Sequence, residues 1–230
     1  MTPYPVKAIA RIQSDFTTKF GIPRQSGLVE ALRAAVVFEP EYRNPDSLRG
    51  LDGFSHIWLI WQFSQSIRTG WSPTVRPPRL GGNERVGVFA SRSPFRPNAL
   101  GLSAVRLLGI ERRTDIGPVL VVAGADLMDG TPIFDVKPYL PYTDCLPQAT
   151  GGFASSGGGD CLRVEFPQQW LDLVPPDKRE ALTGVLARDP RPPYQDDPNR
   201  VYGMAFAGMD IRFTVRAHIL TVCQVTPSVP

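Results

Sequence analysis

The residues best suited to chemistry lie in one basic, proline-rich stretch, residues 76–101, which reads RPPRLGGNERVGVFASRSPFRPNALG. Near its end, Arg92 and Arg96 alternate with prolines, and the ring of Phe95 and the amide of Asn98 stand beside them. Proline stiffens the backbone, so each guanidinium is presented at a low entropic cost. A guanidinium offers a planar fork of donors that suits phosphate and carboxylate groups. These residues predict that the stretch is the functional centre and serves an anionic, nucleotide-like ligand.

The charge of the surrounding region also favours an anionic partner. The whole chain has a net charge of only +3. Residues 53–110, however, contain a single acid, Glu84, against seven arginines. A solvated basic loop is the simpler explanation, but solvated surfaces usually mix charges of both signs. We therefore expect this block to face an anion. Its arginines are Arg68, Arg76, Arg79, Arg85, Arg92, Arg96 and Arg106.

Two short segments elsewhere hold polar side chains at constrained backbone positions. Pro23 fixes the chain ahead of Arg24 and Gln25, so that a guanidinium and an amide project from a loop. Ser64 and Gln65 follow the most apolar run of the protein, FSHIWLIWQF, at residues 54–63. A strand end that turns polar is either a pocket wall or an ordinary strand exit, and the sequence leaves both open.

The fourth segment, residues 126–139, is rich in carboxylates and reads DLMDGTPIFDVKPY. Turn chemistry explains much of Asp129-Gly130-Thr131-Pro132. Three aspartates, Asp126, Asp129 and Asp135, nevertheless lie within a few residues of one another and of Lys137. Acids beside a basic block indicate a site that holds an ammonium or sulfonium as well as an anion.

Other kinds of site find little support. The three cysteines are widely spaced, with no C-x-x-C pair, which argues against a zinc site or a disulfide framework and favours reduced thiols, buried or in loops. No catalytic triad is visible, and His56, within the apolar run, is interpreted as a core histidine. No membrane-spanning run or signal segment is found, so we expect a cytoplasmic protein without a membrane or metal partner.

The elements that must position these residues are mostly strands. Glycine and proline are frequent, which favours short strands joined by shaped loops. Residues 44–48 form a possible helical turn capped by Asn44. Strands without intervening helices indicate a mainly β fold, a single-sheet antiparallel β-barrel spanning residues 1–146. The expected strands are residues 6–12, 35–38, 54–63, 85–90, 102–110, 119–127 and 133–139.

A second, smaller unit follows the barrel. Residues 147–160 are rich in glycine and serine and are interpreted as a linker or mobile loop, because the GK[ST] ending of a phosphate-binding loop is missing. Residues 175–187 have helical spacing of apolar residues. Three strand patterns follow at residues 201–206, 211–216 and 217–225. Residues 161–230 are therefore predicted to form a small α+β domain that packs on the first.

These segments together resemble a known family. The PRQ at Pro23, FSHIWLI, WSPTVRPPRLGG, FASRSPFRPNALG and DLMDGTPIFDVKPYLPY resemble TrmO, the TsaA-like family of S-adenosylmethionine-dependent tRNA methyltransferases. Further on, DPRPPY at residues 189–194 looks like the signature of the bacterial TrmO C-terminal domain. The chain reads RPNALG where the family more often has RPNPIG.

The resemblance implies a homodimer built on a compact β-barrel. It also implies methyl transfer from S-adenosyl-L-methionine to the N6 nitrogen of threonylcarbamoyladenosine, next to the anticodon of tRNA, with a threonine-type tRNA as the expected substrate. Family positions for the cofactor carry over to Pro23, Arg24, Gln25, Ser64, Gln65, Arg92, Leu127, Asp129, Gly130, Thr131 and Pro132.

Further roles follow from combining the resemblance with the charge pattern. We expect the C-terminal domain to recognise tRNA, and Asp135 is the hypothetical proton acceptor. Two rival functions remain: a non-catalytic RNA-binding module and a methyltransferase for a small metabolite. The residues expected to bind tRNA are Arg76, Arg79, Arg85, Arg96, Asn98, Arg191 and Tyr194.

Overall fold

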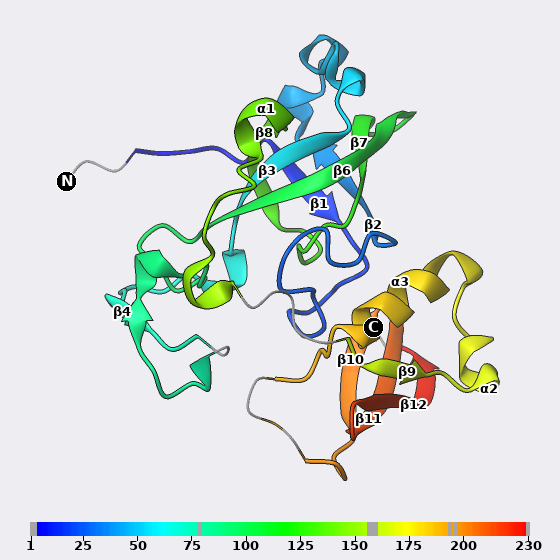
Figure 1. The fold of residues 1–230 in the computed structure, drawn as a ribbon. Coiled ribbons are helices and arrows are strands. Elements are labelled where there is room, and N and C mark those ends of the chain that lie inside the picture. The colour runs from blue at the N-terminus through cyan, green and yellow to red at the C-terminus, as the bar shows by residue number, and fades with distance from the viewer. Residues whose placement is uncertain (1–3, 78–79, 156–160, 193–194, 196, 229–230) are drawn as a thin grey trace.

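Six strands with inward-facing apolar residues close into a barrel in the N-terminal part of the chain (Figure 1). The computed structural model describes residues 4–77, 80–155, 161–192, 195 and 197–228. All six pairings are antiparallel, in the order β1-β2-β7-β6-β3-β8, and β8 pairs again with β1. The prediction of a mainly β fold is confirmed. The strands are β1 (Ala10–Gln13), β2 (Arg33–Phe38), β3 (His56–Gln62), β6 (Leu100–Arg113), β7 (Gly117–Ala123) and β8 (Pro132–Pro138).

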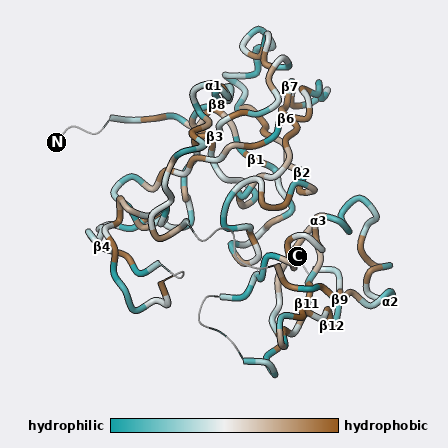
Figure 2. The backbone as a smooth tube through the Cα atoms, viewed as in Figure 1, coloured by the Kyte–Doolittle hydropathy of each residue, from teal (hydrophilic) through white to brown (hydrophobic). Residues whose placement is uncertain are grey.

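Burial alternates along the barrel strands β3 and β6, whose residues are coloured by hydropathy in Figure 2. On β3 the side chains of Ile57, Leu59 and Trp61 point into the core. Their neighbours on the outer face are less buried. An apolar run of this kind is typical of a strand buried on both faces, but here Trp58 and Ile60 on the outer face are only half-buried. The prediction of a core histidine is wrong: His56 is exposed, and its Nδ1 lies 2.9 Å from Ser55 Oγ.

Residues 64–98 form a lobe beside the barrel, which we call the arginine lobe (Figure 1). Its described strands are β4 (Thr74–Val75) and β5 (Val86–Gly87), which pair with each other. The predicted strand at residues 85–90 is thus mostly wrong, because a 3₁₀ turn, Val88–Ala90, follows β5. Proline removes ladder donors on both sides of this segment, which limits pairing.

Short helical turns connect the barrel strands. The expected turn at residues 44–48 is confirmed, since the Asn44 side chain accepts from the Asp46 backbone N–H at 3.0 Å. A short helix, α1 (Pro141–Asp144), follows the barrel. The 3₁₀ turns in the described chain include Pro40–Tyr42, Pro45–Leu48, Leu51–Gly53, Ser64–Ser66, Val88–Ala90 and Gly152–Ala154.

The C-terminal unit is an α+β unit, as predicted. Its helix α3 (Pro176–Ala187) matches the predicted helix, and a second sheet has the order β10-β11-β12-β9. The parallel strand β9 (Arg163–Glu165) and the short helix α2 (Gln168–Leu171) were not predicted. The other strands are β10 (Tyr202–Phe206), β11 (Met209–Arg216) and β12 (Ile219–Pro227).

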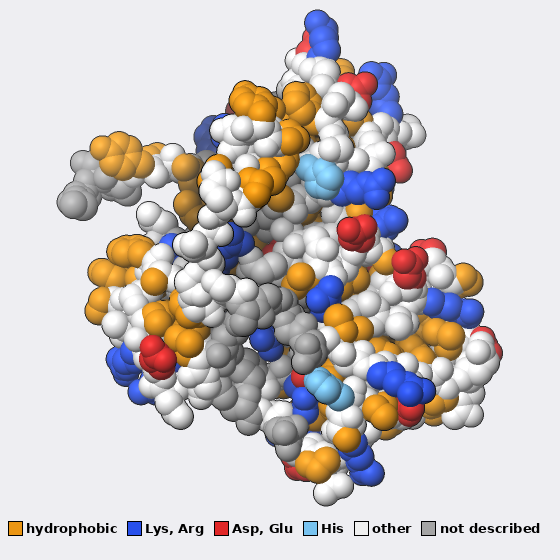
Figure 3. Space-filling model, viewed as in Figure 1, with side chains coloured by type: hydrophobic (Ala, Val, Ile, Leu, Met, Phe, Trp, Pro, Cys, Tyr) orange, Lys and Arg blue, Asp and Glu red, His pale blue; other side chains and the backbone are white. Residues whose placement is uncertain are grey.

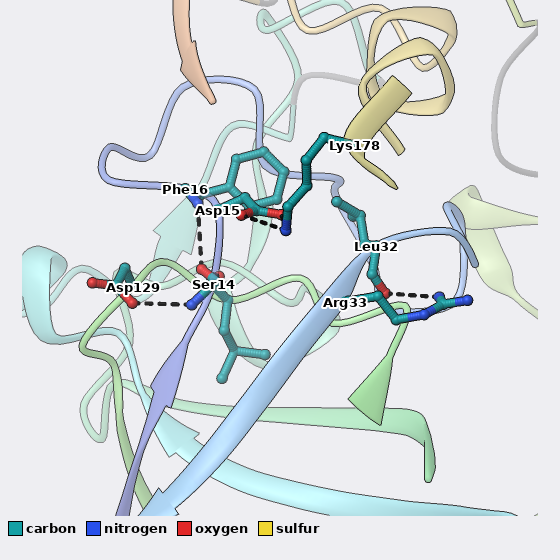
Figure 4. A network of polar contacts seen from close by, with 8 residues as sticks. Ser14, Asp15, Phe16, Leu32, Arg33, Asp129 and Lys178 are labelled. Carbon is teal, nitrogen blue, oxygen red and sulfur yellow. Dashed lines mark hydrogen bonds and ion pairs between the residues drawn. The ribbon is translucent and has the colours of Figure 1, made fainter. Parts of the chain in front are cut away.

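The C-terminal unit shares a hydrophobic core with residues 14–32, which we call the docked loop. Phe16, Val29 and Leu32 of this loop are buried in the same cluster as α3 and strands β10 to β12. The rings of Phe16 and Phe206 meet edge to face at 5.4 Å. At the rim, Lys178 Nζ of α3 contacts Asp15 Oδ2 at 2.7 Å (Figure 4). The docked loop therefore belongs to the core of the C-terminal unit.

Several predicted absences concern only the described chain. Cys145, Cys161 and Cys223 are free and exposed. Cys145 and Cys161 lie in loops as expected, whereas Cys223 lies exposed on β12, so the expectation of a buried or loop cysteine is wrong for it. Within the described residues, no group of three or more histidines, cysteines or acids is placed to hold a metal. A search of the same residues finds no helix with the length and apolarity needed to span a bilayer.

Candidate functional site

The docked loop contains the first of the four segments selected from the sequence, Pro23–Gln25, and it contacts the other three. Its first residue, Ser14, binds the turn at residues 127–131. Lys19, further along, binds the segment that follows β3. Gln25 binds Arg92. Because each contact joins residues far apart in the chain, the fold gathers the four predicted segments around one loop.

The turn after β7 is fixed by hydrogen bonds to Ser14 (Figure 4). Asp129 Oδ1 accepts the Ser14 backbone N–H at 3.0 Å, and Ser14 Oγ donates to the Leu127 carbonyl at 2.9 Å. The Thr131 hydroxyl, which is buried, donates to the Met128 carbonyl at 2.6 Å. Gly130 has a φ of 72°, a conformation that favours glycine. The buried side chains of Leu127, Thr131 and Pro132 therefore shape the turn, and Asp129 ties it to the docked loop.

Lys19 connects the docked loop to the entrance of the arginine lobe. Its Nζ donates to the Gln65 carbonyl at 2.5 Å and lies 3.0 Å from Ser66 Oγ. Ser64, Gln65 and Ser66 form a 3₁₀ turn at the end of β3. The contact uses the backbone of Gln65, which leaves its amide side chain available for a ligand.

Arg92 and Gln25 meet directly, although 67 positions separate them in the chain. The Arg92 guanidinium donates to Gln25 Oε1, and the Gln25 amide nitrogen donates to the Arg24 carbonyl. Arg92 is exposed, so its remaining donors face outward. An outward-facing guanidinium beside an amide forms a binding site for a carboxylate or phosphate.

Asp126, which follows β7, is a half-buried carboxylate that the charge of Arg92 influences. Ser103 Oγ on β6 donates to Asp126 Oδ1 at 2.6 Å and accepts the Trp61 indole N–H at 3.0 Å. Burial raises the pKa of the Asp126 carboxyl above 3.8; the Ser103 hydrogen bond and the charge of Arg92 are among the interactions that oppose this shift. The net shift is upward because desolvation of the charged form outweighs these contacts. The site thus contains a half-buried acid whose pKa responds to the charge of an exposed cation.

Sequence reasoning missed four members of this network. Ser14 and Lys19 lie outside the four selected segments, and their partners lie far away in sequence. Ser103 and Trp61 were hidden within apolar strands. Ser103 nevertheless carries a signal, because it is a polar residue at an inward-facing position of β6, between Gly101 and Val105. A buried hydroxyl needs a partner, and Asp126 provides it.

The arginine lobe presents most of the predicted tRNA-binding side chains. Arg76, Arg85 and Asn98 are exposed, and Arg96 is anchored by a 3.0 Å bond to the Ser91 carbonyl. Arg68 lies over the ring of Phe95, 3.9 Å from its centre, so this ring is already stacked on a cation. Figure 3 shows Lys and Arg side chains around this lobe and between it and the neighbouring units. Arg79, another predicted residue, lies outside the described residues.

Residues 189–192, the described part of the DPRPPY segment, form a turn at the junction with the C-terminal unit. Asp189 binds Arg191 through two bonds of 2.8 Å, and only 14% of the Arg191 side chain is exposed. Burial raises the pKa of Asp189, but the hydrogen bonds and charge of Arg191, with the charge of Arg24, outweigh it and lower the pKa below 3.8. A cavity of about 330 Å³ lies between this turn and the docked loop. Tyr194 lies outside the described residues.

Asp135, the predicted proton acceptor, lies apart from the Asp126 network. It pairs with Ile60 on the barrel ladder, and its carboxylate contacts Lys137 Nζ at 3.0 Å. About 44% of its side chain is exposed. An exposed, ion-paired carboxylate remains accessible to a substrate that approaches the outer face of the barrel.

Comparisons with known proteins agree with this geometry. The model of the tRNA-methyltransferase O N-terminal domain matches residues 11–145, and that of the TrmO C-terminal domain matches residues 161–228. The chain is 39% identical to the tRNA (adenine(37)-N6)-methyltransferase of Escherichia coli, over 94% of both chains. It is 38% identical to the putative S-adenosylmethionine-dependent methyltransferase RcsF of Pseudomonas aeruginosa, over 91% of this chain and 92% of the other. The crystal structure of TrmO from Pseudomonas aeruginosa superposes with a TM-score of 0.81 at 32% identity, covering 98% of this chain and 99% of the other.

Proposed function

The chain belongs to the TrmO family of S-adenosylmethionine-dependent tRNA methyltransferases, and we propose that its substrate is the threonylcarbamoyladenosine next to the anticodon. The observation that carries the proposal is the contact between Gln25 and Arg92, with the carboxylate of Asp126 under the influence of the Arg92 charge. Residues 1–146 would bind the cofactor and perform catalysis, and residues 161–230 would recognise tRNA.

The donors and acceptors at this place fit the cofactor. The amino-acid part of S-adenosylmethionine carries a carboxylate and an ammonium group. The guanidinium and amide of Arg92 and Gln25 suit the carboxylate, and the nearby acids suit the cation. The Asp129–Pro132 turn and the Ser64–Gln65 segment border the same loop. The proposed cofactor residues are Pro23, Arg24, Gln25, Ser64, Gln65, Arg92, Leu127, Asp129, Gly130, Thr131 and Pro132.

The chain's own residues contribute chiefly positioning. When bound, the cofactor supplies a methyl group on a sulfonium, so a C–S bond breaks as the N6–C bond forms. Fixing the two reactants in line supplies much of the acceleration of such a transfer. The N6 proton needs an acceptor, and Asp135 is proposed for that role. Full turnover of Asp135→Asn with saturating cofactor would contradict this role.

The arginine lobe is proposed to bind the tRNA backbone. Arg76 and Arg85 are exposed on it, and Arg96 is held by the Ser91 carbonyl, so their cationic groups can reach phosphates. Arg191 already pairs with Asp189, and its proposed role is therefore to shape the junction that tRNA contacts. Phosphate contacts release counterions, so tRNA affinity should fall steeply with salt.

A homodimer is proposed for this protein, with the outer face of β3 and β6 as its contact. Leu100 and Leu102 on this face are 43% and 56% exposed. Leu102 pairs with Ile60 across the β3–β6 ladder, and Leu100 lies next to Leu102 on the same face, so the three form one apolar surface. Contiguous apolar surface of this kind marks contact sites. We expect Leu102→Glu to shift the molecular mass in solution to that of a monomer. Because tRNA is its substrate, we place the protein in the cytoplasm.

The decisive experiment is mass spectrometry of tRNA nucleosides after incubation with the protein and cofactor. We expect threonylcarbamoyladenosine to gain one methyl group, with Arg92→Gln much slower and the control Arg112→Gln, which changes an exposed arginine on β6, unchanged. An unchanged nucleoside in every tRNA would contradict the proposal. A non-catalytic RNA-binding module would bind tRNA without the cofactor, and a small-metabolite methyltransferase would bind the cofactor without salt-sensitive tRNA binding.

A further inference from the structure

The arginine lobe exposes two large aromatic side chains that lie beside each other. Trp71 is 54% exposed and Phe89 is 74% exposed. Their ring centres are 6.2 Å apart, and the ring planes are inclined by 32°. Single exposed apolar side chains are common on protein surfaces, but apolar side chains that meet in an exposed patch mark contact sites. The pair therefore indicates a binding surface on this lobe.

The small β4–β5 ladder brings the two rings together. Trp71 comes just before β4, and Phe89 comes just after β5. The two strands pair antiparallel, and beyond them the Val88 N–H donates to the Pro73 carbonyl at 2.9 Å. Val88 is buried, which anchors the backbone next to Phe89. Aromatic side chains have few rotatable bonds, so a pair that is already placed loses little rotamer freedom on binding.

Two exposed arginines lie at the other end of the same ladder. Arg76 directly follows β4, and Arg85 directly precedes β5. Arg85 Nη1 donates to Thr74 Oγ1 at 3.2 Å. Because Thr74 pairs with Gly87, the Arg85 side chain runs along the ladder towards Phe89. Figure 3 shows hydrophobic side chains in orange and Lys and Arg side chains in blue on the surface of this lobe. One two-stranded element thus presents both cations and aromatic rings.

This combination fits a single-stranded nucleic acid better than another protein surface. Guanidinium groups bind phosphates, and aromatic rings stack on bases. In a duplex the base faces are covered by neighbouring bases, whereas bases in a loop can be unstacked. A second copy of this chain would bring the same cations to the contact, since residues 53–110 contain one acid against seven arginines. Like charges would repel across such a contact.

We propose that Trp71 and Phe89 form a stacking platform for one unpaired base of the anticodon loop, with Arg76 and Arg85 on the flanking phosphates. The inference rests on the proposed function, which makes tRNA the substrate, and adds to it a contact with a base. Stacking tolerates every base, so the platform positions the loop and does not select its sequence. Because stacking is not an ionic contact, its loss should weaken binding equally at every salt concentration.

The test measures the affinity of the full chain for two RNAs, the anticodon stem-loop of a threonine tRNA and an RNA duplex of the same length. Trp71→Leu keeps an apolar side chain but removes the ring, and we expect it to bind the stem-loop about tenfold more weakly. The slope of log affinity against log salt should stay that of the parent. Affinity for the duplex should change less than about twofold, because its bases are stacked and paired. Phe89→Leu should act in the same direction.

Two further variants serve as controls. Trp71→Phe keeps a ring at the same place, and its affinity for the stem-loop should stay within about threefold of that of the parent. Tyr142→Leu removes a ring that is 85% exposed on α1, outside the arginine lobe, and should bind both RNAs like the parent. The melting temperature should not change in any of these variants, because the altered side chains are exposed. Cofactor affinity and molecular mass in solution should also stay those of the parent.

Several outcomes would overturn the inference. Unchanged stem-loop affinity in Trp71→Leu, or an equal loss for the duplex, would show that the rings do not stack on an unpaired base. A loss of cofactor affinity alone would assign the rings to the adenine of the cofactor, and a fall in molecular mass would assign them to a contact between copies. A parent that binds the stem-loop through Trp71 but leaves tRNA unmethylated would contradict the proposed function alone. A parent that binds neither RNA would contradict both.

Discussion

The docked loop, residues 14–32, and the arginine lobe, residues 64–98, both supply proposed site residues, yet they are held in different ways. Phe16, Val29 and Leu32 bury the docked loop in the core of the C-terminal unit. In the described part of the arginine lobe, Val88 is the single fully buried residue, and aromatic side chains such as Phe89 and Phe95 are exposed. Buried apolar packing fixes the docked loop. Turns, local hydrogen bonds and the two-residue pairing of β4 with β5 hold the arginine lobe.

This difference separates two tasks. A small cofactor binds more tightly to a preformed site, because the conformational entropy of the site is already lost when the protein folds. A large, charged partner such as tRNA is better served by a segment that can adjust, with cations that act over several ångströms. The comparison predicts that substitutions in the docked loop lower stability, whereas those in the arginine lobe lower tRNA affinity.

The largest expected effect is on the shared core. Phe16→Ala removes a fully buried ring that packs on Phe206, and we expect the free energy of unfolding to fall by about 3–5 kcal/mol. Chemical denaturation measures it. The matched control is Phe89→Ala in the arginine lobe, where the side chain is 74% exposed and the change should stay within about 0.5 kcal/mol. Equal losses for the two variants would refute the comparison.

The ion pair at the rim of the docked loop should have the next largest effect. Lys178→Ala leaves the Asp15 carboxylate, 15% exposed, without its partner, and we expect a loss of about 2 kcal/mol. Lys7→Ala is the control, since its 4.0 Å pair with Glu41 is exposed and should contribute less than about 0.5 kcal/mol. Thermal melts of both variants decide the point, and a Lys178→Ala protein as stable as the control would show that this pair does not anchor the loop.

A pH titration of stability tests the turn that borders the docked loop. The pKa of Asp189 is lowered in the folded protein, so its ionised form stabilises the fold above the ordinary pKa of 3.8, and this stability is lost as the pH falls through the lower folded value. We expect Asp189→Asn to be about 1 kcal/mol less stable at neutral pH. The difference from the parent should shrink below pH 3.8. A constant difference down to pH 2 would contradict this assignment.

The smallest effect on stability, and the clearest on binding, is expected in the arginine lobe. Arg76→Gln should leave the melting temperature unchanged, while the slope of log affinity for tRNA against log salt falls by about 0.9. Binding titrations at several salt concentrations measure the slope. Arg112→Gln, an exposed arginine on the barrel, should behave like the parent in both assays. A loss of stability without a change in slope would reverse the comparison.

Sequence reasoning predicted elements with a local pattern and missed those that depend on distant partners. Helix α3 was expected because Leu182, Val185 and Leu186 have helical spacing, and all three are buried. Strand β9 is three residues long and depends on a parallel partner, β12, which no local pattern reveals. The exposure of His56 was missed because an apolar run does not show which of its faces is covered.

For the functional site, too, local motifs could be predicted from the sequence, whereas contacts between distant residues could not. The order of the PRQ, arginine and DGTP motifs predicted its segments, and the fold joins them. The contacts that hold them together, such as Ser14 with Asp129, span over a hundred residues and follow from barrel closure alone. Asp126 was noted as one acid among three, but its hydrogen bond depends on Ser103, which faces inward beside Trp61 only once the strands have paired.

The closure of β8 on β1 sets the order in which the chain can mature during synthesis. β1 pairs with residues 132 and 133, so the barrel stays open until β8 has left the ribosome. The side chain of Phe16 is buried even later in synthesis, because the apolar cluster that buries it extends to Val225 in β12. Long-range pairings of this kind fold slowly, and apolar segments that wait for them are exposed to aggregation. The docked loop is therefore made early and buried last, and a nascent chain stalled before β12 would present it to chaperones.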